Sequence, residues 1–167
     1  MPIKLILTGG TIDKDYNELN GELGFVKTHI NSMLKQARCH IRLNIQQLML
    51  IDSLQMTEQH RQEILTACQK TSSDKIIITH GTDTMVETAK ALAGQIHNKT
   101  IILLGAMIPY IFKKSDALFN LGCAISAVQC LDSGIYITMN GRIFTWDNVR
   151  KNREIGRFEA LERNSLR

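Results

Sequence analysis

The stretch KIIITHGTDT (Lys75–Thr84) joins an apolar, β-branched run to a polar turn. A nearly continuous apolar run of this length is typical of a strand that is covered on both faces, as in a parallel sheet. After the turn, a helix is predicted to begin near Met85 and to end near Gly94. The segment therefore predicts a strand–turn–helix unit whose turn carries histidine, threonine and aspartate side chains.

Units of this kind recur along the whole chain. Strands are predicted over 3–8, 41–51, 75–79, 100–104 and 134–139, and helices over 28–38, 57–70, 85–94 and 115–131. Thr57 is the expected N-cap of the second helix, and Ser115-Asp116 is the expected cap of the fourth. Residues 13–25 are polar and predict a long loop or an irregular hairpin.

The alternation of strands and helices predicts the fold class. Parallel neighbours need crossover connections, so this order forces a parallel sheet with helices on both faces. We expect one α/β domain over residues 1–167, a Rossmann-like or flavodoxin-like three-layer fold with a mainly parallel five-stranded sheet.

Composition excludes several classes of function. The net charge is +4 over 167 residues, which is too small to indicate a nucleic-acid-binding protein. The four cysteines are scattered and show no metal-ligand spacing, so we expect no metal site and a reducing, cytoplasmic location. Neither a secretion signal nor an apolar run of membrane-spanning length is present in these residues, which predicts no membrane association.

Polar residues gather where three predicted strands end. Thr8–Thr11 (TGGT) follows the first strand, His80–Asp83 (HGTD) the third, and Gly105–Met107 the fourth. Such strand ends meet in one crevice of a doubly wound sheet, where ligands bind. Taken alone, the glycine pair is most simply a tight turn and Thr82-Asp83 most simply a helix N-cap.

Their coincidence favours a catalytic site over two unrelated turns. The phosphate-loop and dinucleotide patterns are both absent. A hydroxyl becomes a useful nucleophile when a neighbouring group accepts its proton, and threonines with an aspartate and a lysine can form such a relay.

Six segments, in this order, resemble the bacterial-type L-asparaginase family. They are TGGTI (8–12), DSLQMT (52–57), ITHGTDTMVETA (78–89), ILLGAMIP (102–109), SDALFNL (115–121) and GRIFTWDNVRKNR (141–153). The match covers the amino-terminal domain of that family, and the chain looks most like the short-chain asparaginases.

The resemblance implies a role for individual residues. Thr11 matches the primary nucleophile, Thr82 a second reactive hydroxyl, and Asp83 the residue that binds the substrate amine. Lys151 would complete a Thr82–Lys151–Asp83 relay, and Ser53 matches a contact to the substrate α-carboxylate. The implied reaction is hydrolysis of L-asparagine to L-aspartate and ammonia through an acyl-threonine, without a metal or an organic cofactor.

Some positions depart from the family pattern. The larger enzymes have a tyrosine that helps to activate the nucleophile; here Tyr16 is preferred over Phe25, because only a phenol can hydrogen-bond to Thr11. Leu54 and Ile108 stand where polar contacts are common. The larger enzymes also complete each site with a second domain from a neighbouring subunit, so we expect weaker substrate binding here.

Other functions stay open at this point. L-Glutamine or D-asparagine could be the better substrate. A non-catalytic amino-acid-binding or regulatory module is the main alternative, and a purely structural domain is a third. We expect a homodimer or homotetramer.

Overall fold

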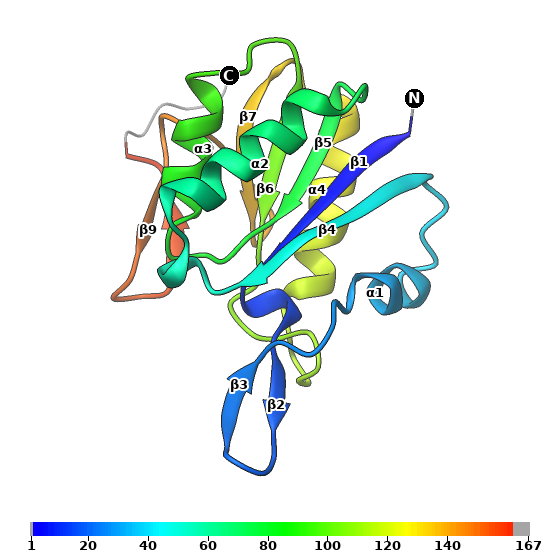
Figure 1. Cartoon of the computed structure of the whole chain (residues 1–167), viewed down its shortest axis with the longest axis vertical. Helices are drawn as coiled ribbons and strands as arrows, with labels where there is room; N and C mark the ends of the chain where they lie inside the picture. Colours follow the sequence, from blue (N-terminus) through cyan, green and yellow to red (C-terminus); the bar gives the residue numbers. More distant parts are fainter. Residues whose placement is uncertain (1, 162–167) are drawn as a thin grey trace.

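The computed structural model describes residues 2–161; residues 1 and 162–167 of the predicted domain lie outside the described part. A six-stranded sheet lies between two layers of helices (Figure 1). Its strands are β1 (Ile3–Gly9), β4 (Leu43–Ile51), β5 (Lys75–Thr79), β6 (Thr100–Leu104), β7 (Gly134–Met139) and β8 (Arg142–Thr145).

The predicted fold class is confirmed. The sheet order is β4-β1-β5-β6-β7-β8, and the first five of these strands are parallel. Numbered along the chain, the five parallel strands have the order 2-1-3-4-5, which is the flavodoxin-like arrangement. The sixth strand, β8, pairs antiparallel with β7 and was not predicted.

Four helices cover the two faces of the sheet. They are α1 (Ile30–Gln36) and α4 (Ala117–Cys130) on one face, and α2 (Glu58–Lys70) and α3 (Met85–Ala93) on the other. Successive side chains of a strand point to opposite faces. Ile76 and Ile78 therefore join the core under α2 and α3, whereas Ile77 joins the core under α1 and α4.

Short elements complete the described part of the chain. Two 3-10 turns, η1 (Thr11–Asp13) and η2 (Ser53–Gln55), follow β1 and β4. A hairpin of β2 (Asp15–Asn17) and β3 (Glu22–Gly24) extends away from the body of the molecule in Figure 1, so the polar segment is a hairpin. A second hairpin pairs β9 (Arg150–Asn152) with β10 (Arg157–Glu159).

The two helix caps had different outcomes. Thr57 caps α2 as predicted, because its hydroxyl accepts a hydrogen bond from the His60 N–H at 3.4 Å. At α4, Asp116 occupies the predicted N-cap position but makes no side-chain capping bond, because its carboxylate accepts from the N–H groups of Met107 at 2.9 Å and Ile108 at 3.1 Å. Asp116 thus ties down the loop after β6, while the Ser115 hydroxyl accepts from the first N–H of the helix.

The position of the site follows from the strand order. The chain leaves β1 for β4 on one side and then crosses by α2 to β5 on the other side. The order therefore reverses between β1 and β5, and ligands of open α/β sheets bind outside the carboxyl ends of such strands. The TGGT and HGTD turns both leave the sheet at this point.

Within residues 2–161 no helix is long and apolar enough to cross a lipid bilayer. The four cysteines are free thiols. Burial raises the pKa of Cys68 to about 12, so this thiol stays protonated and unreactive at neutral pH.

Candidate active site

Close packing of glycines brings three loops together at the strand ends. A Cβ atom on Gly10 would lie 2.4 Å from the Gly81 backbone nitrogen, and one on Gly81 would lie 2.5 Å from Ser53 Oγ. The Gly10 N–H also donates to the Ile51 carbonyl at 3.0 Å. The residues before Thr11 and before Thr82 are therefore in direct contact, and this contact places the two threonine-bearing turns side by side.

We expect Gly10→Ala to lower the free energy of unfolding by about 2 kcal/mol or more, because Gly10 has φ +83° and a methyl group would overlap Gly81. The matched control is Gly122→Ala in α4, where a Cβ meets open space. That change should be neutral or stabilising by about 0.5–1 kcal/mol. Urea unfolding measures both, and equal midpoints for the two variants would contradict the packing account.

Lys151 joins the two candidate residues of the HGTD turn. Its Nζ lies 2.8 Å from Thr82 Oγ1 and 2.8 Å from Asp83 Oδ1. The lysine side chain comes from β9, is 11% exposed, and forms an ion pair with Asp83. Arg153 adds a hydrogen bond to the Asp83 carbonyl at 3.2 Å. Residues 69 positions apart in the sequence thus form one connected polar group.

The other predicted site residues lie around this group at different degrees of burial. Thr11 is half-buried at the start of η1, and Ser53 is buried against Gly81. Thr8, in contrast, has a structural part, since its hydroxyl donates to the Thr79 carbonyl at 2.7 Å. Among residues 2–161, neither the Thr11 hydroxyl nor the Thr82 backbone N–H makes a hydrogen bond, so both remain available to a ligand.

The structure does not bring Tyr16 to Thr11. Tyr16 lies on β2, is 52% exposed, and its ring packs beside that of Phe112 with centroids 6.4 Å apart. Its hydroxyl is 3.9 Å from where a Cβ of Gly21 would lie, toward the tip of the same hairpin. Phe25, the alternative, lies with its ring centroid 6.0 Å from the Lys14 ammonium.

Lys14 and Asp52 form an ion pair beside the turn that carries Thr11, and sequence reasoning missed it as part of the site. Partial burial raises the pKa of Asp52, but hydrogen bonds from Lys14 and the Leu54 N–H, with the charges of Lys14 and Lys151, lower it below its ordinary value overall. Asp52 is therefore ionised at neutral pH. The sequence signal that could have indicated this pair is its position: Lys14 comes shortly after the TGGTI motif, and Asp52 is the first residue of DSLQMT.

The buried ring of His80, the first residue of the HGTD turn, makes hydrogen bonds that fix the turn. It is fully buried, its Nδ1 lies 2.7 Å from the Gly81 carbonyl, and its Nε2 lies 2.8 Å from Thr88 Oγ1. Because a carbonyl only accepts, Nδ1 carries the proton and Nε2 accepts from Thr88. Burial lowers the pKa of His80 to about 4, with the nearby Arg61 charge acting in the same direction and the Gly81 hydrogen bond opposing it.

The lowered pKa of His80 makes stability depend on pH. At pH below about 6.5 an unfolded chain protonates this histidine, whereas the folded chain does so only near pH 4. The free energy of unfolding should therefore fall by about 3 kcal/mol from this group as pH drops from 7 to 4. Denaturant unfolding across this range checks it. His80→Gln should remove this component and His97→Gln, an exposed control, should keep it; equal slopes in both variants would contradict it.

The hairpin base holds a second set of buried polar groups that sequence reasoning missed. Asp13 is fully buried, and its Oδ1 accepts from Thr28 Oγ1 at 3.0 Å and from the His29 N–H at 2.8 Å. Burial raises the pKa of Asp13, although these two hydrogen bonds oppose that rise. Asp15 Oδ1 lies 2.8 Å from His29 Nε2. No periodic pattern marks these residues, since polar contacts between loops follow none.

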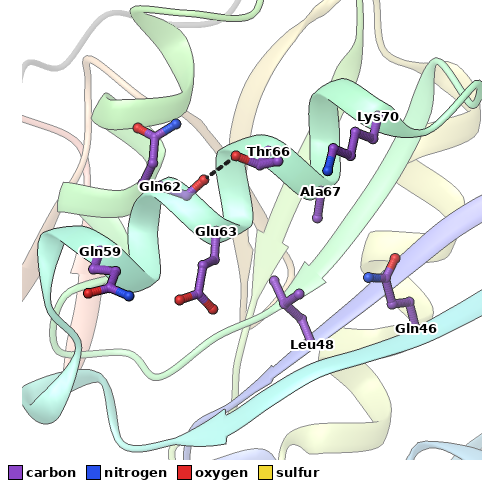
Figure 2. Close-up of a pocket in the computed structure, with 8 residues that line it drawn as sticks. All are labelled: Gln46, Leu48, Gln59, Gln62, Glu63, Thr66, Ala67 and Lys70. Atoms are coloured by element: carbon purple, nitrogen blue, oxygen red, sulfur yellow. Dashed lines mark hydrogen bonds between the residues drawn. The ribbon is translucent and has the colours of Figure 1, made fainter.

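A separate cavity of about 340 Å³ lies between β4 and α2. Figure 2 shows that glutamine, glutamate, threonine and lysine side chains surround it, with Leu48 of β4 below the helix. None of the candidate site residues lines this cavity. The Thr66 hydroxyl donates a hydrogen bond to the Gln62 carbonyl at 2.8 Å. Within residues 2–161 no group of three or more His, Cys, Asp or Glu side chains is arranged to hold a metal ion.

Comparison with known proteins identifies the family to which this chain belongs. A family model described as the N-terminal part of asparaginase matches residues 2–166. The chain belongs to the asparaginase family. Its predicted resemblance is confirmed, and the fold agrees: the thermostable L-asparaginase from Thermococcus kodakarensis superposes with a TM-score of 0.84 at 27% identity, over 96% of this chain and 51% of that one.

Curated relatives of this asparaginase domain give the same result. L-asparaginase 2 of Escherichia coli is 28% identical to this chain in an alignment that spans 98% of this chain and 51% of that protein. The L-asparaginase of Thermococcus kodakarensis is 38% identical over 85 residues, which span 50% of this chain and 26% of that protein. Where the match covers nearly the whole chain, this asparaginase domain spans about half the length of its relative.

Proposed function

We propose that this chain is an amidohydrolase that converts L-asparagine to L-aspartate and ammonia. The observation that carries the proposal is the Lys151 ammonium, which lies 2.8 Å from both Thr82 Oγ1 and Asp83 Oδ1 in a member of the asparaginase family. A domain that only binds an amino acid has no need for two threonines and a bridging lysine at adjacent strand ends.

The reaction uses Thr11 as the nucleophile. Its oxygen bonds to the side-chain amide carbon of asparagine, its proton passes to the leaving amine, and ammonia departs to leave an aspartyl ester on Thr11. Water then attacks the carbonyl carbon of the ester, the bond from this carbon to the Thr11 oxygen breaks, and aspartate is released. A proton from the water restores the Thr11 hydroxyl. Backbone N–H groups that have no partner, such as that of Thr82, are the donors for the oxyanion of both steps.

The relay and the substrate contacts divide among the remaining residues. Lys151 orients the Thr82 hydroxyl and exchanges protons with it, while Asp83 holds Lys151 and takes the substrate α-amine. Ser53 lies under Gly81 and supplies the contact to the α-carboxylate. Tyr16 hydrogen-bonds to Thr11 only after the β2–β3 hairpin moves toward the turn, because its hydroxyl points to the hairpin tip in this structure.

Further proposals concern the setting of this site. We place the protein in the cytoplasm, as a homodimer or homotetramer that needs no cofactor. L-Glutamine and D-asparagine remain competing substrates. A non-catalytic amino-acid-binding or regulatory module is the second candidate, and one observation favours it: among residues 2–161 no side chain forms a hydrogen bond with the Thr11 hydroxyl that could accept its proton.

Ammonia release from L-asparagine by the purified protein, followed alongside calorimetric binding of asparagine and aspartate, separates the two functions. The enzyme proposal expects ammonia in proportion to protein concentration, with lower rates on L-glutamine and D-asparagine. Binding of either amino acid without ammonia over several hours would contradict the enzyme and support the binding module.

A further inference from the structure

The β2–β3 hairpin is fixed to the body of the molecule at its entry and is bonded mainly within itself beyond that point. Figure 1 shows the hairpin standing away from the sheet and helices. Its tip is closed by internal bonds, such as the one from the Gly21 N–H to the Asn17 carbonyl at 2.8 Å. The residues at its entry decide how Tyr16, which follows them, is presented.

Three consecutive entry residues are each tied to another part of the chain. Asp13 accepts from Thr28 and from the His29 N–H, and Lys14 donates to Asp52. Asp15 Oδ1 lies 2.8 Å from His29 Nε2. His29 thus contacts the entry twice, through its backbone and through its ring.

His29 is itself held firmly. Its side chain is 9% exposed, it stands at the start of α1, and its ring lies 5.9 Å from that of Tyr110. Tyr110 is in turn anchored to α1 by a hydrogen bond from its hydroxyl to Gln36 Oε1 at 2.6 Å. The histidine ring therefore presents Nε2 to the hairpin from a rigid support.

Each of the two carboxylates at the hairpin entry has one oxygen without a hydrogen-bond partner in the described part of the chain. Asp13 Oδ2 and Asp15 Oδ2 are buried without a hydrogen bond among residues 2–161. A buried carboxylate that loses its partner is costly and gains by reaching water. If the His29 contact is lost, Asp15 is stabilised by moving outward, and β2 moves with it.

Strand geometry links this contact to Tyr16. Adjacent side chains of a β-strand point to opposite faces. Because Asp15 points toward His29, Tyr16 points to the other face, where it packs against Phe112. The direction of the tyrosine is set one residue earlier, by the bond between Asp15 and His29.

We propose that His29 is a positioning residue that fixes the direction of Tyr16 through Asp15. This inference rests on the proposed function for its catalytic consequence, but the hold on the hairpin is independent of turnover. The hairpin must move for Tyr16 to reach Thr11, and the His29 contact fixes the entry about which it moves. Loss of the His29 ring frees that entry, so β2 opens more readily and Tyr16 no longer has a defined path to Thr11.

The first test is limited proteolysis of the full chain with a glutamate-specific protease, which can cut the exposed hairpin at Glu18 and Glu22. His29→Leu should speed this cleavage by about tenfold, because it removes a hydrogen bond to a charged group. His29→Gln keeps a donor and should stay near the wild-type rate, as should the exposed control His97→Leu. Asp15→Leu should raise the cleavage rate as much as His29→Leu does, if the contact between Asp15 and His29 is what holds the hairpin.

Kinetics test the link to Tyr16. His29→Leu should lower kcat/KM for L-asparagine by about tenfold to hundredfold, and His29→Gln should restore most of it. If His29 acts through Tyr16, the double variant with Tyr16→Phe should be no worse than Tyr16→Phe alone. Additive losses would overturn the proposed link, and unchanged hairpin cleavage in His29→Leu would overturn the hold itself. Faster cleavage in a protein that releases no ammonia would keep the hold and reject the proposed function instead.

Discussion

Thr11→Ala is expected to reduce ammonia release from L-asparagine by about 10⁴-fold or more, the largest effect of any single substitution here. The change removes the attacking oxygen and leaves the turn intact. Gly9 and Gly10 set the turn by their own packing against Ile51 and Gly81. The Thr11 hydroxyl, in contrast, makes no hydrogen bond among residues 2–161.

Stability and a matched variant separate the loss of the nucleophile from a loss of structure. The free energy of unfolding of Thr11→Ala should stay within about 0.5 kcal/mol of wild type. Thr66→Ala on α2 also removes a threonine hydroxyl, and it should keep full activity because Thr66 bonds only to its own helix. If the Thr11→Ala protein keeps its activity, Thr11 is not the nucleophile.

Lys151→Met should lower kcat/KM by about 10³-fold, in the range of losses that follow removal of an acid–base group. Without Nζ the Thr82 hydroxyl loses its 2.8 Å partner. Among residues 2–161, the Asp83 carboxylate then keeps only the ion pair with Arg153, whose Nε is 3.9 Å away. Arginine should not rescue the activity, because a planar guanidinium replaces a compact ammonium and does not give up its proton.

Lys90→Met on α3 is the control for this experiment, since it removes an exposed lysine that lies outside the site. The two variants should have similar unfolding midpoints and differ in turnover. If Lys151→Met and Lys90→Met hydrolyse asparagine at the same rate, the relay is not part of the mechanism.

The fold was predictable wherever hydrophobic periodicity was strong. Segments such as 75–79 and 100–104 are continuous apolar runs, because strands buried on both faces need them, and both were correctly predicted. Strand β8 (RIFT) was missed because it is short and antiparallel, with Phe144 as its one buried side chain. Nothing in four residues of this kind distinguishes a strand from a loop.

The site was predictable in part, and for a different reason. Thr82, Asp83 and Lys151 were proposed together from motifs, and the structure brings their side chains within hydrogen-bond distance; their roles stay proposals. The position of Tyr16 was not predictable. It depends on the contact between Asp15 and His29, and a single polar pair between distant loops leaves no pattern in the sequence.

Mass spectrometry of the wild-type protein, quenched in acid during turnover of L-asparagine, tests the central claim most directly. The peptide LILTGGTIDK (residues 5–14) should carry an aspartyl ester, and fragmentation should place it on Thr11 and not on Thr8, whose hydroxyl is buried and bonded to Thr79. An ester on Thr82, or an unmodified peptide in a sample that is releasing ammonia, would contradict the assignment of Thr11 as the nucleophile.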